Sequence, residues 1–170
     1  NYDLAYGGAY YAIVNGSNLD LSSGSTIGKF IDVGMDIKNS IIKETEIEHP
    51  TITDMNFLYG TIFTFEPLDK NNHSRNVCVF ANGEVDRSPT GTGVSARAAV
   101  HFKRGEITLN ETLTIESILG STFKVSVLGE TNLGSLNAII PEVEGTANIV
   151  GKNTFWIDPD DDIGQGFMLR

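Results

Sequence analysis

The sequence predicts an α+β domain in which a curved, mostly antiparallel sheet wraps one central helix. Many short apolar runs alternate with turn residues, and the chain has 18 glycines, as expected for antiparallel strands joined by turns. Residues 94–102 are rich in alanine and valine on almost every side, which favours a helix buried by the sheet. Residues 25–48 carry apolar side chains at 3.6-residue spacing, which predicts an amphipathic helix lying on the sheet.

Length and charge narrow the classes of protein. The 170 residues suffice for one domain with a sizeable core, or for part of a two-domain protein. The net charge of −10 argues against nucleic acid and anionic membranes as partners.

The single cysteine, Cys78, excludes an internal disulfide, and we interpret it as an unreactive core thiol. Because the sequence shows neither a signal peptide nor an apolar run near the length of a membrane span, we expect a cytoplasmic protein.

The first half of the sequence predicts strands on either side of the amphipathic helix. Residues 9–14 form the first strand. The helix begins after Ser25 as its N-cap and is ended by Pro50. Residues 51–65, which are β-branched and aromatic, form one strand or a bent pair, and residues 76–81 form a short apolar strand.

The region after the central helix is turn-rich and predicts further strands. These are residues 107–109, 112–117, 122–128 and 136–140, with at least one more in 147–157. The acidic residues 158–162 lack the glycine and glutamate spacing of a calcium loop, so we interpret them as a solvated turn. His101 lies far along the helix from its start, which favours packing over catalysis, and we expect no metal site.

Residues 86–93, Asp-Arg-Ser-Pro-Thr-Gly-Thr-Gly, come directly before the central helix and predict a tight turn. Gly91 and Gly93 let the backbone approach something small. The first amides of a helix have no intrahelical acceptor and lie at its positive end. The stretch therefore predicts an anion site, the alternative being that the glycines serve close packing only.

This octet resembles the second active-site motif of the proline racemase family, which reads Asp-Arg-Ser-Pro-Cys-Gly-Thr-Gly. Residues 3–8 resemble a crossover between two domains in that family. Residues 116–120 and 155–170, with Gly164-Gln165-Gly166-Phe167, resemble later landmarks, so the likeness covers essentially the whole chain. It implies the fold shared with diaminopimelate epimerase, in which two pseudo-symmetric domains hold the active site between them.

The resemblance implies a division of the chain. Residues 1–8 are expected to be the crossover from an N-terminal domain, residues 9–150 the second domain, and residues 151–170 a segment that returns to the first. The family's Met-Cys-Gly-His motif, with its cysteine, is expected in that N-terminal domain. Cys78 does not match the motif, because no Gly-His follows it.

The same resemblance implies roles for several residues. Asp86 resembles the residue that holds the substrate's ring nitrogen, and the amides of Gly91 and Thr92 resemble the cradle of its carboxylate. Phe80 resembles an aromatic wall of the apolar pocket. From the residues alone, Asp86 has a second interpretation as a turn residue that bonds its own backbone.

Thr90 departs from the racemase motif, which has a second cysteine at this position. A thiol with a pKa of about 8.5 can be tuned to exchange protons near neutral pH, whereas a threonine hydroxyl is far too weak an acid. The family's trans-3-hydroxy-L-proline dehydratases have threonine here and need to remove the Cα proton from one side only. The resemblance therefore implies a hydro-lyase that converts trans-3-hydroxy-L-proline to pyrroline-2-carboxylate, with Thr90 as a catalytic group and no cofactor.

Two other functions stay open. One is a proline or 4-hydroxyproline racemase or epimerase with an unusual residue 90, and the other is a carboxylate-binding module without chemistry. The expected partner is a small molecule of the hydroxyproline type, and a homodimer is a further expectation. We expect residues 1–170 alone to be inactive, because the abstracting cysteine would lie in the other domain.

Overall fold

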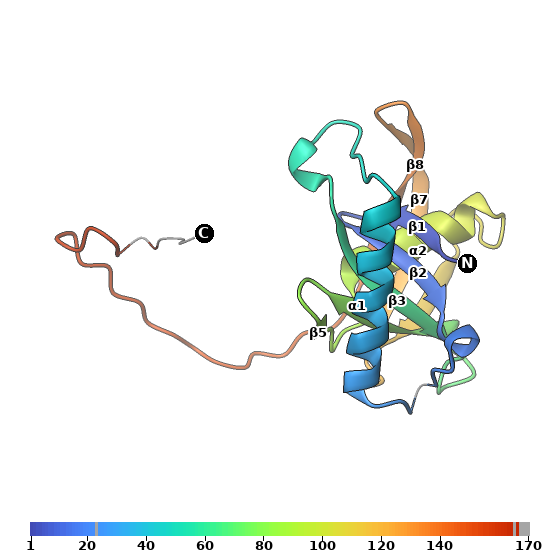
Figure 1. Cartoon of the computed structure of the whole chain (residues 1–170), viewed down its shortest axis with the longest axis horizontal. Coiled ribbons are helices and arrows are strands. Elements are labelled where there is room, and N and C mark those ends of the chain that lie inside the picture. The colour runs from blue at the N-terminus through green and yellow to red at the C-terminus, as the bar shows by residue number, and fades with distance from the viewer. Residues whose placement is uncertain (23, 165, 167–170) are drawn as a thin grey trace.

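The computed structural model describes residues 1–22, 24–164 and 166, and their core is one curved eight-stranded sheet (Figure 1). Its strands are β1 (Asp3–Tyr6), β2 (Tyr10–Asn15), β3 (Leu58–Phe65), β4 (Ser74–Phe80), β5 (Glu84–Val85), β6 (Thr112–Glu116), β7 (Thr122–Leu133) and β8 (Leu136–Glu144). Their order is β1-β2-β3-β4-β6-β7-β8, with β5 paired to β4. The pairings β2–β3 and β4–β6 are parallel and the others antiparallel, so the mostly antiparallel sheet is confirmed.

Two helices lie on opposite faces of this sheet. α1 (Ile27–Glu44) packs on β3 and β4, whereas α2 (Gly91–Lys103) contacts β1, β2, β7 and β8. Because successive strand residues point to opposite faces, Phe63 joins the apolar cluster beneath α1 and Ile62 joins the cluster beneath α2. The site at the start of α2 is therefore carried by a helix that the sheet supports.

α2 is the central helix that the sequence predicts. Ala96 packs with residues of β1 to β4, while Val94 and Ala98 pack against β6 and β7. All three side chains are fully buried. Small side chains let strands approach the helix from several sides, and Gly105, with φ +71°, follows the end of the helix. The sheet wrapped around a small-residue helix is thus confirmed.

The predicted boundaries of α1 are wrong at both ends. Its N-cap is Thr26, whose side chain accepts a hydrogen bond from the Lys29 amide at 3.3 Å, and not Ser25. The helix ends at Glu44, well before Pro50. The next residues are extended because the chain there packs on the sheet, where Ile47 is buried. Tertiary packing, and not the proline, ends the helix.

Two of the predicted strands are absent from the described residues. Residues 107–109 form a turn that inserts Ile107 into the core, and residues 147–157 run away from the sheet in Figure 1. Ile149 and Trp156 in that segment are 98% and 94% exposed, so no neighbouring strand pairs with it. β7 is longer than predicted because a bulge between Val127 and Gly129 lets the strand continue past its glycine. Strands β1 and β5 were not predicted from the sequence.

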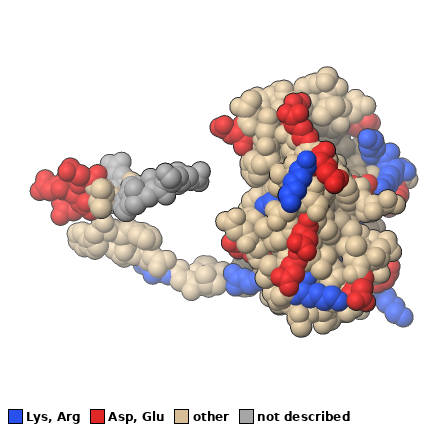
Figure 2. All heavy atoms as spheres, in the orientation of Figure 1, with Lys and Arg blue, Asp and Glu red and all other residues tan. Residues whose placement is uncertain are grey.

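The acidic residues 158–162 form an exposed turn, as predicted. The Asp160 and Ile163 amides donate to Oδ1 of Asp158 at 3.0 Å and of Asp161 at 3.1 Å, respectively. Figure 2 shows a dense acidic group at the far end of this extended segment. Gln165 and Phe167 of the landmark noted above lie outside the described residues. No helix in the part of the chain that the structure describes has the length and apolar character to cross a membrane.

Candidate active site

The carboxylate of Asp86 organises the loop between β5 and α2. The backbone N–H of Asp86 donates to the Cys78 carbonyl at 3.0 Å, which places the residue beside the end of β4. Oδ1 of Asp86 accepts a hydrogen bond from the Ser88 amide at 2.8 Å, and Oδ2 accepts one from the Thr90 hydroxyl at 2.9 Å. The interpretation of Asp86 as a turn residue is therefore correct, and its second oxygen is directed at Thr90.

Thr90 has an uncommon backbone conformation. Its φ is 72° and its ψ 101°, a region that β-branched residues rarely adopt, and such strain costs on the order of 1–3 kcal/mol. Hydrogen bonds hold it from both sides, since its N–H donates to Ser88 Oγ at 3.0 Å and its carbonyl accepts from Val94 at 2.8 Å. The side chain is only 6% exposed. Over-determined strain of this kind is frequent in functional sites.

The first turn of α2 has free hydrogen-bond donors. Within the described chain, the N–H groups of Gly91, Thr92 and Gly93 have no hydrogen-bond acceptor. Thr92 is fixed by its side chain, whose hydroxyl lies 2.7 Å from the hydroxyl of the buried Tyr11. These amides lie at the positive end of a 13-residue helix, which is favourable for an anion such as a carboxylate.

The two glycines of this turn have different surroundings. A Cβ atom on Gly93 would come within 2.6 Å of Ile62 Cδ1, so the packing alternative is correct for Gly93. Beside Gly91, by contrast, a Cβ atom would have no neighbour within 4 Å. The backbone of Gly7 in turn packs against the backbone of Thr92 and of the next helical turn. Packing therefore explains Gly93, and the open space lies beside Gly91.

Aromatic rings extend from Phe80, the residue expected to form the pocket wall. Its ring centroid lies 5.4 Å from that of Tyr59, which lies 5.9 Å from the ring of Tyr11. Tyr11 thus connects the aromatic rings to Thr92. Sequence reasoning missed Tyr11 and Tyr59. Their only signal was an aromatic side chain in a strand that packs beneath the central helix, and this is also typical of ordinary core residues.

Comparison with known proteins identifies the family. The family model described as proline racemase matches residues 1–168. The chain belongs to the proline racemase family. A trans-3-hydroxy-L-proline dehydratase of Colwellia psychrerythraea is 48% identical, and a 3-hydroxyproline 2-epimerase of Burkholderia multivorans is 43% identical, each over 99% of the chain. The chain covers 48% and 50% of these two proteins, so it spans about half the length of the curated relatives it matches.

A solved structure supports the same family. The hydroxyproline epimerase from Agrobacterium vitis, with bound trans-4-hydroxy-L-proline, matches with a TM-score of 0.83 and 33% identity. The match covers 99% of this chain and 48% of the epimerase. The fold is therefore the diaminopimelate epimerase-like fold, as the sequence predicted. The named relatives are enzymes of both the dehydratase and the epimerase kind.

Cys78 lies beneath the candidate active site, yet it is a buried core residue. Cys78 is 1% exposed, and burial raises the pKa of the thiol to about 12. The negative charge of Asp86 raises it further. A thiol that stays protonated at neutral pH cannot act as a base, in agreement with the interpretation of Cys78 as unreactive.

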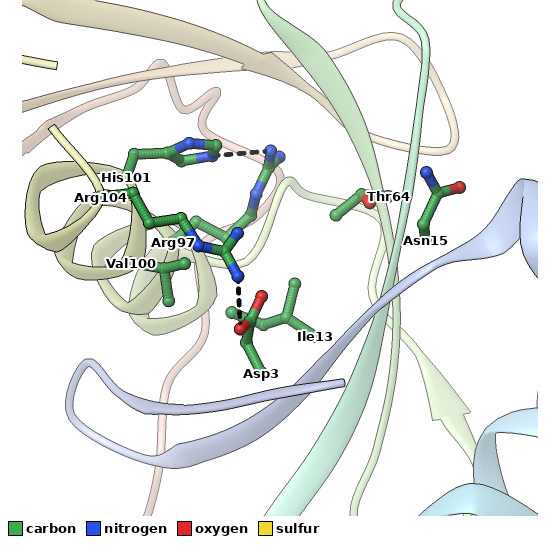
Figure 3. Close-up of a pocket in the computed structure, with 8 residues that line it drawn as sticks. All are labelled: Asp3, Ile13, Asn15, Thr64, Arg97, Val100, His101 and Arg104. Atoms are coloured by element: carbon green, nitrogen blue, oxygen red, sulfur yellow. Dashed lines mark hydrogen bonds and ion pairs between the residues drawn. The ribbon is translucent and has the colours of Figure 1, made fainter. Parts of the chain in front are cut away.

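A second polar cluster lies farther along α2 from the candidate site. A cavity of about 210 Å³ is lined by Arg97 and His101 of the helix, by Arg104 directly after it and by Asp3 of β1 (Figure 3). His101 lies 2.5 Å from a carboxylate oxygen of Glu106, and Arg104 donates to Asp3 at 2.7 Å. Since Gly91 and Thr92 lie at the opposite end of the helix, His101 is remote from the candidate site, as its position in the sequence predicted. The described residues hold no group of three or more His, Cys, Asp or Glu side chains arranged for a metal ion.

Proposed function

We propose that the complete protein dehydrates trans-3-hydroxy-L-proline to pyrroline-2-carboxylate. The observation that carries this proposal is the hydroxyl of Thr90, buried between Asp86 and the first turn of α2. By the motif resemblance, racemases have a thiol at this position. The dehydratase from Colwellia psychrerythraea, 48% identical over nearly the whole chain, supports the same reaction.

The reaction needs a base on one face of the substrate only. Removal of the Cα proton leaves electrons that form the Cα–C3 double bond as the C3–O bond breaks. The proton and the departing hydroxide together make water, so no other reactant is needed. Racemisation requires in addition an acid on the opposite face of Cα, and the Thr90 hydroxyl is far too weak an acid for this.

The site offers a partner for each polar group of the substrate. The amides of Gly91 and Thr92 bind the carboxylate, which stabilises the charge that develops when Cα loses its proton. Asp86 holds the cationic ring nitrogen with Oδ2, and Phe80 covers the apolar side of the ring. Thr90 hydrogen-bonds the leaving 3-hydroxyl, and in the structure its hydroxyl donates to Asp86 Oδ2 at 2.9 Å.

The base belongs to the other half of the protein. We assign it to the cysteine of a Met-Cys-Gly-His motif in an N-terminal domain, with residues 1–8 as the crossover and 9–150 as the second domain. Residues 151–170 return to the first domain. Phe155 and Trp156 are 87% and 94% exposed. Large exposed aromatic side chains on an extended segment indicate that another protein surface covers them, which supports the return of this segment to the first domain. The proposed reaction uses no cofactor.

An epimerase is the second candidate. The 3-hydroxyproline 2-epimerase of Burkholderia multivorans is 43% identical, only slightly less than the dehydratase. The hydroxyl of Thr90 nevertheless favours dehydration, since inversion at Cα needs an acid of suitable pKa on the second face.

Two incubations of the complete protein test the proposal. With trans-3-hydroxy-L-proline we expect pyrroline-2-carboxylate, and with L-proline, which has no 3-hydroxyl to lose, we expect no product. Formation of D-proline would instead identify a racemase, and binding of both amino acids without any product would identify a carboxylate-binding module. Residues 1–170 alone are the matched control and should give no turnover, because the base is missing. Turnover by that fragment would contradict the two-domain assignment.

A further inference from the structure

We infer that Asn76 is a positioning residue, which holds the Pro89–Thr90 peptide so that the Thr90 hydroxyl is directed into the site. This inference rests on the proposed function, because the orientation of Thr90 matters to the reaction only if Thr90 takes part in it. Asn76 lies on β4, is 1% exposed, and donates from Nδ2 to the carbonyl of Pro89 at 2.9 Å. The motif resemblance assigns this asparagine no role.

Arg97 determines which way the Asn76 amide faces. Its guanidinium donates to Asn76 Oδ1 at 2.9 Å, and since an arginine can only donate, the oxygen of the amide must face it. The Nδ2 group must then face Pro89, whose carbonyl can only accept. Burial lowers the pKa of Arg97 to about 10, which leaves the guanidinium charged at neutral pH. Only one orientation of the amide satisfies both neighbours.

The peptide plane between Pro89 and Thr90 is held at both of its polar ends. Asn76 binds the carbonyl, and Ser88 Oγ accepts the Thr90 N–H at 3.0 Å. Rotation of this plane changes φ of Thr90, so the two hydrogen bonds together maintain the value of 72°. Because the strained conformation has no support from the residue type, it depends on these contacts.

The carboxylate cradle is fixed separately. Thr92 is bonded to Tyr11, and Ser95 Oγ donates to the carbonyl of Gly91 at 2.9 Å. Neither contact involves Asn76. Loss of the Asn76 bond to Pro89 should therefore move Thr90 and leave the amides that bind the carboxylate in place. This separation gives the inference a kinetic signature, a loss in kcat without a comparable loss in binding.

The test is Asn76→Asp in the complete protein. The carboxylate keeps the acceptor that Arg97 needs and replaces only the donor to Pro89 by a second acceptor, which repels the carbonyl. We expect kcat for dehydration to fall roughly ten- to hundredfold, since small misplacements of a reacting group have effects of this size. The KM, and the Kd for L-proline, should stay within about threefold. In a crystal structure of the variant, φ of Thr90 should leave the left-handed region.

Ser74→Ala is the matched control. It removes the other acceptor of the same Arg97 nitrogen, at 2.7 Å, without touching the bond to Pro89, so kcat and φ of Thr90 should stay as in the native protein. Wild-type kcat in Asn76→Asp, or a loss of kcat with φ of Thr90 unchanged, would overturn the inference. If Asn76→Asp does not fold, Ser88→Ala removes the bond at the other end of the same peptide and should lower kcat selectively. Equal losses in kcat and L-proline affinity there would refute positioning.

Failure of the proposed function has a different signature. A native protein that does not dehydrate trans-3-hydroxy-L-proline refutes that function, whatever the variants do. The crystallographic φ of Thr90 in Asn76→Asp still decides whether Asn76 holds the peptide. A φ that stays near its native value refutes the inference in that case as well.

Discussion

At the scale of single residues, Asp86 and Thr90 form one hydrogen-bonded unit. Asp86 satisfies the Ser88 amide with one oxygen and the Thr90 hydroxyl with the other. A carboxylate has about four lone-pair sites, so Oδ2 can still accept a hydrogen bond from a ring nitrogen. The turn role and the proposed binding role of Asp86 are therefore compatible, and a single substitution can separate them.

Asp86→Asn in the complete protein should weaken L-proline binding and leave the turn intact. The amide oxygen can still accept from Ser88, but the charge that would attract the cationic ring nitrogen is lost. A charge-assisted hydrogen bond contributes on the order of 1.5–3 kcal/mol, so the Kd measured by calorimetry should rise roughly ten- to hundredfold.

The control for this substitution is Asp69→Asn. Oδ1 of Asp69 accepts from the amide two residues ahead at 2.9 Å, as in Asp86, but Asp69 lies in the loop before β4, at the end of that strand remote from the site. Asp69→Asn should leave the Kd for L-proline unchanged. An unchanged Kd in Asp86→Asn as well, with the melting temperature preserved, would restrict Asp86 to its turn role.

For single residues, the sequence predicted the turn contact of Asp86 but not the backbone conformation of Thr90. Both roles considered for Asp86 follow from its residue type and its place in the octet. The positive φ of Thr90 could not be predicted, because threonine disfavours that region and only the surrounding hydrogen bonds impose it. The contribution of Asn76 was hidden for a similar reason, since its two partners are 13 and 21 residues away in the chain.

At the scale of elements, the first turn of α2 combines close packing at Gly93 with the proposed binding of the carboxylate at Gly91. The Ile62 side chain occupies the space that a side chain on Gly93 would need, whereas the space beside Gly91 is open. The composition of residues 94–102 was enough to predict a buried helix, because no amphipathic alternative fits alanine and valine on nearly all sides. The spacing of the two glycines could not show which of them is closely packed, because this depends on the position of Ile62 on β3, which contacts the helix.

Gly91→Ala and Gly93→Ala in the complete protein should therefore fail in different ways. A Cβ on Gly93 collides with Ile62, and overpacking of this kind costs about 1–3 kcal/mol, so the melting temperature should fall. A Cβ on Gly91 meets no protein atom within 4 Å, but it would enter the space in which we propose that the substrate carboxylate binds. The melting temperature should then be preserved while the Kd for L-proline rises by about tenfold or more. Unimpaired binding in Gly91→Ala would place the carboxylate elsewhere.

At the scale of the whole molecule, the sheet wrapped around α2 followed from the sequence, but its edges did not. The motif resemblance assigns the residues of β1 to a crossover between domains and does not predict a strand. The pairing of β1 with β2 depends on a chain reversal at Gly7-Gly8, which brings the backbone against α2. Residues 147–157 have the composition of a strand, yet strand propensity forms no strand without a partner edge. The proposed division of labour explains both the open site and the exposed segment, since each would face the other half of the protein.

The central claim is that this protein removes the Cα proton without inverting Cα. The most direct test follows trans-3-hydroxy-L-proline and the complete protein in heavy water by NMR, with chiral analysis of the amino acid recovered. We predict pyrroline-2-carboxylate and a recovered substrate that keeps its L configuration. Thr90→Cys provides a positive control, because the start of α2 stabilises a thiolate that can act as a second acid–base group, and it should give detectable cis-3-hydroxy-D-proline. Formation of cis-3-hydroxy-D-proline by the native protein would contradict the account and identify an epimerase.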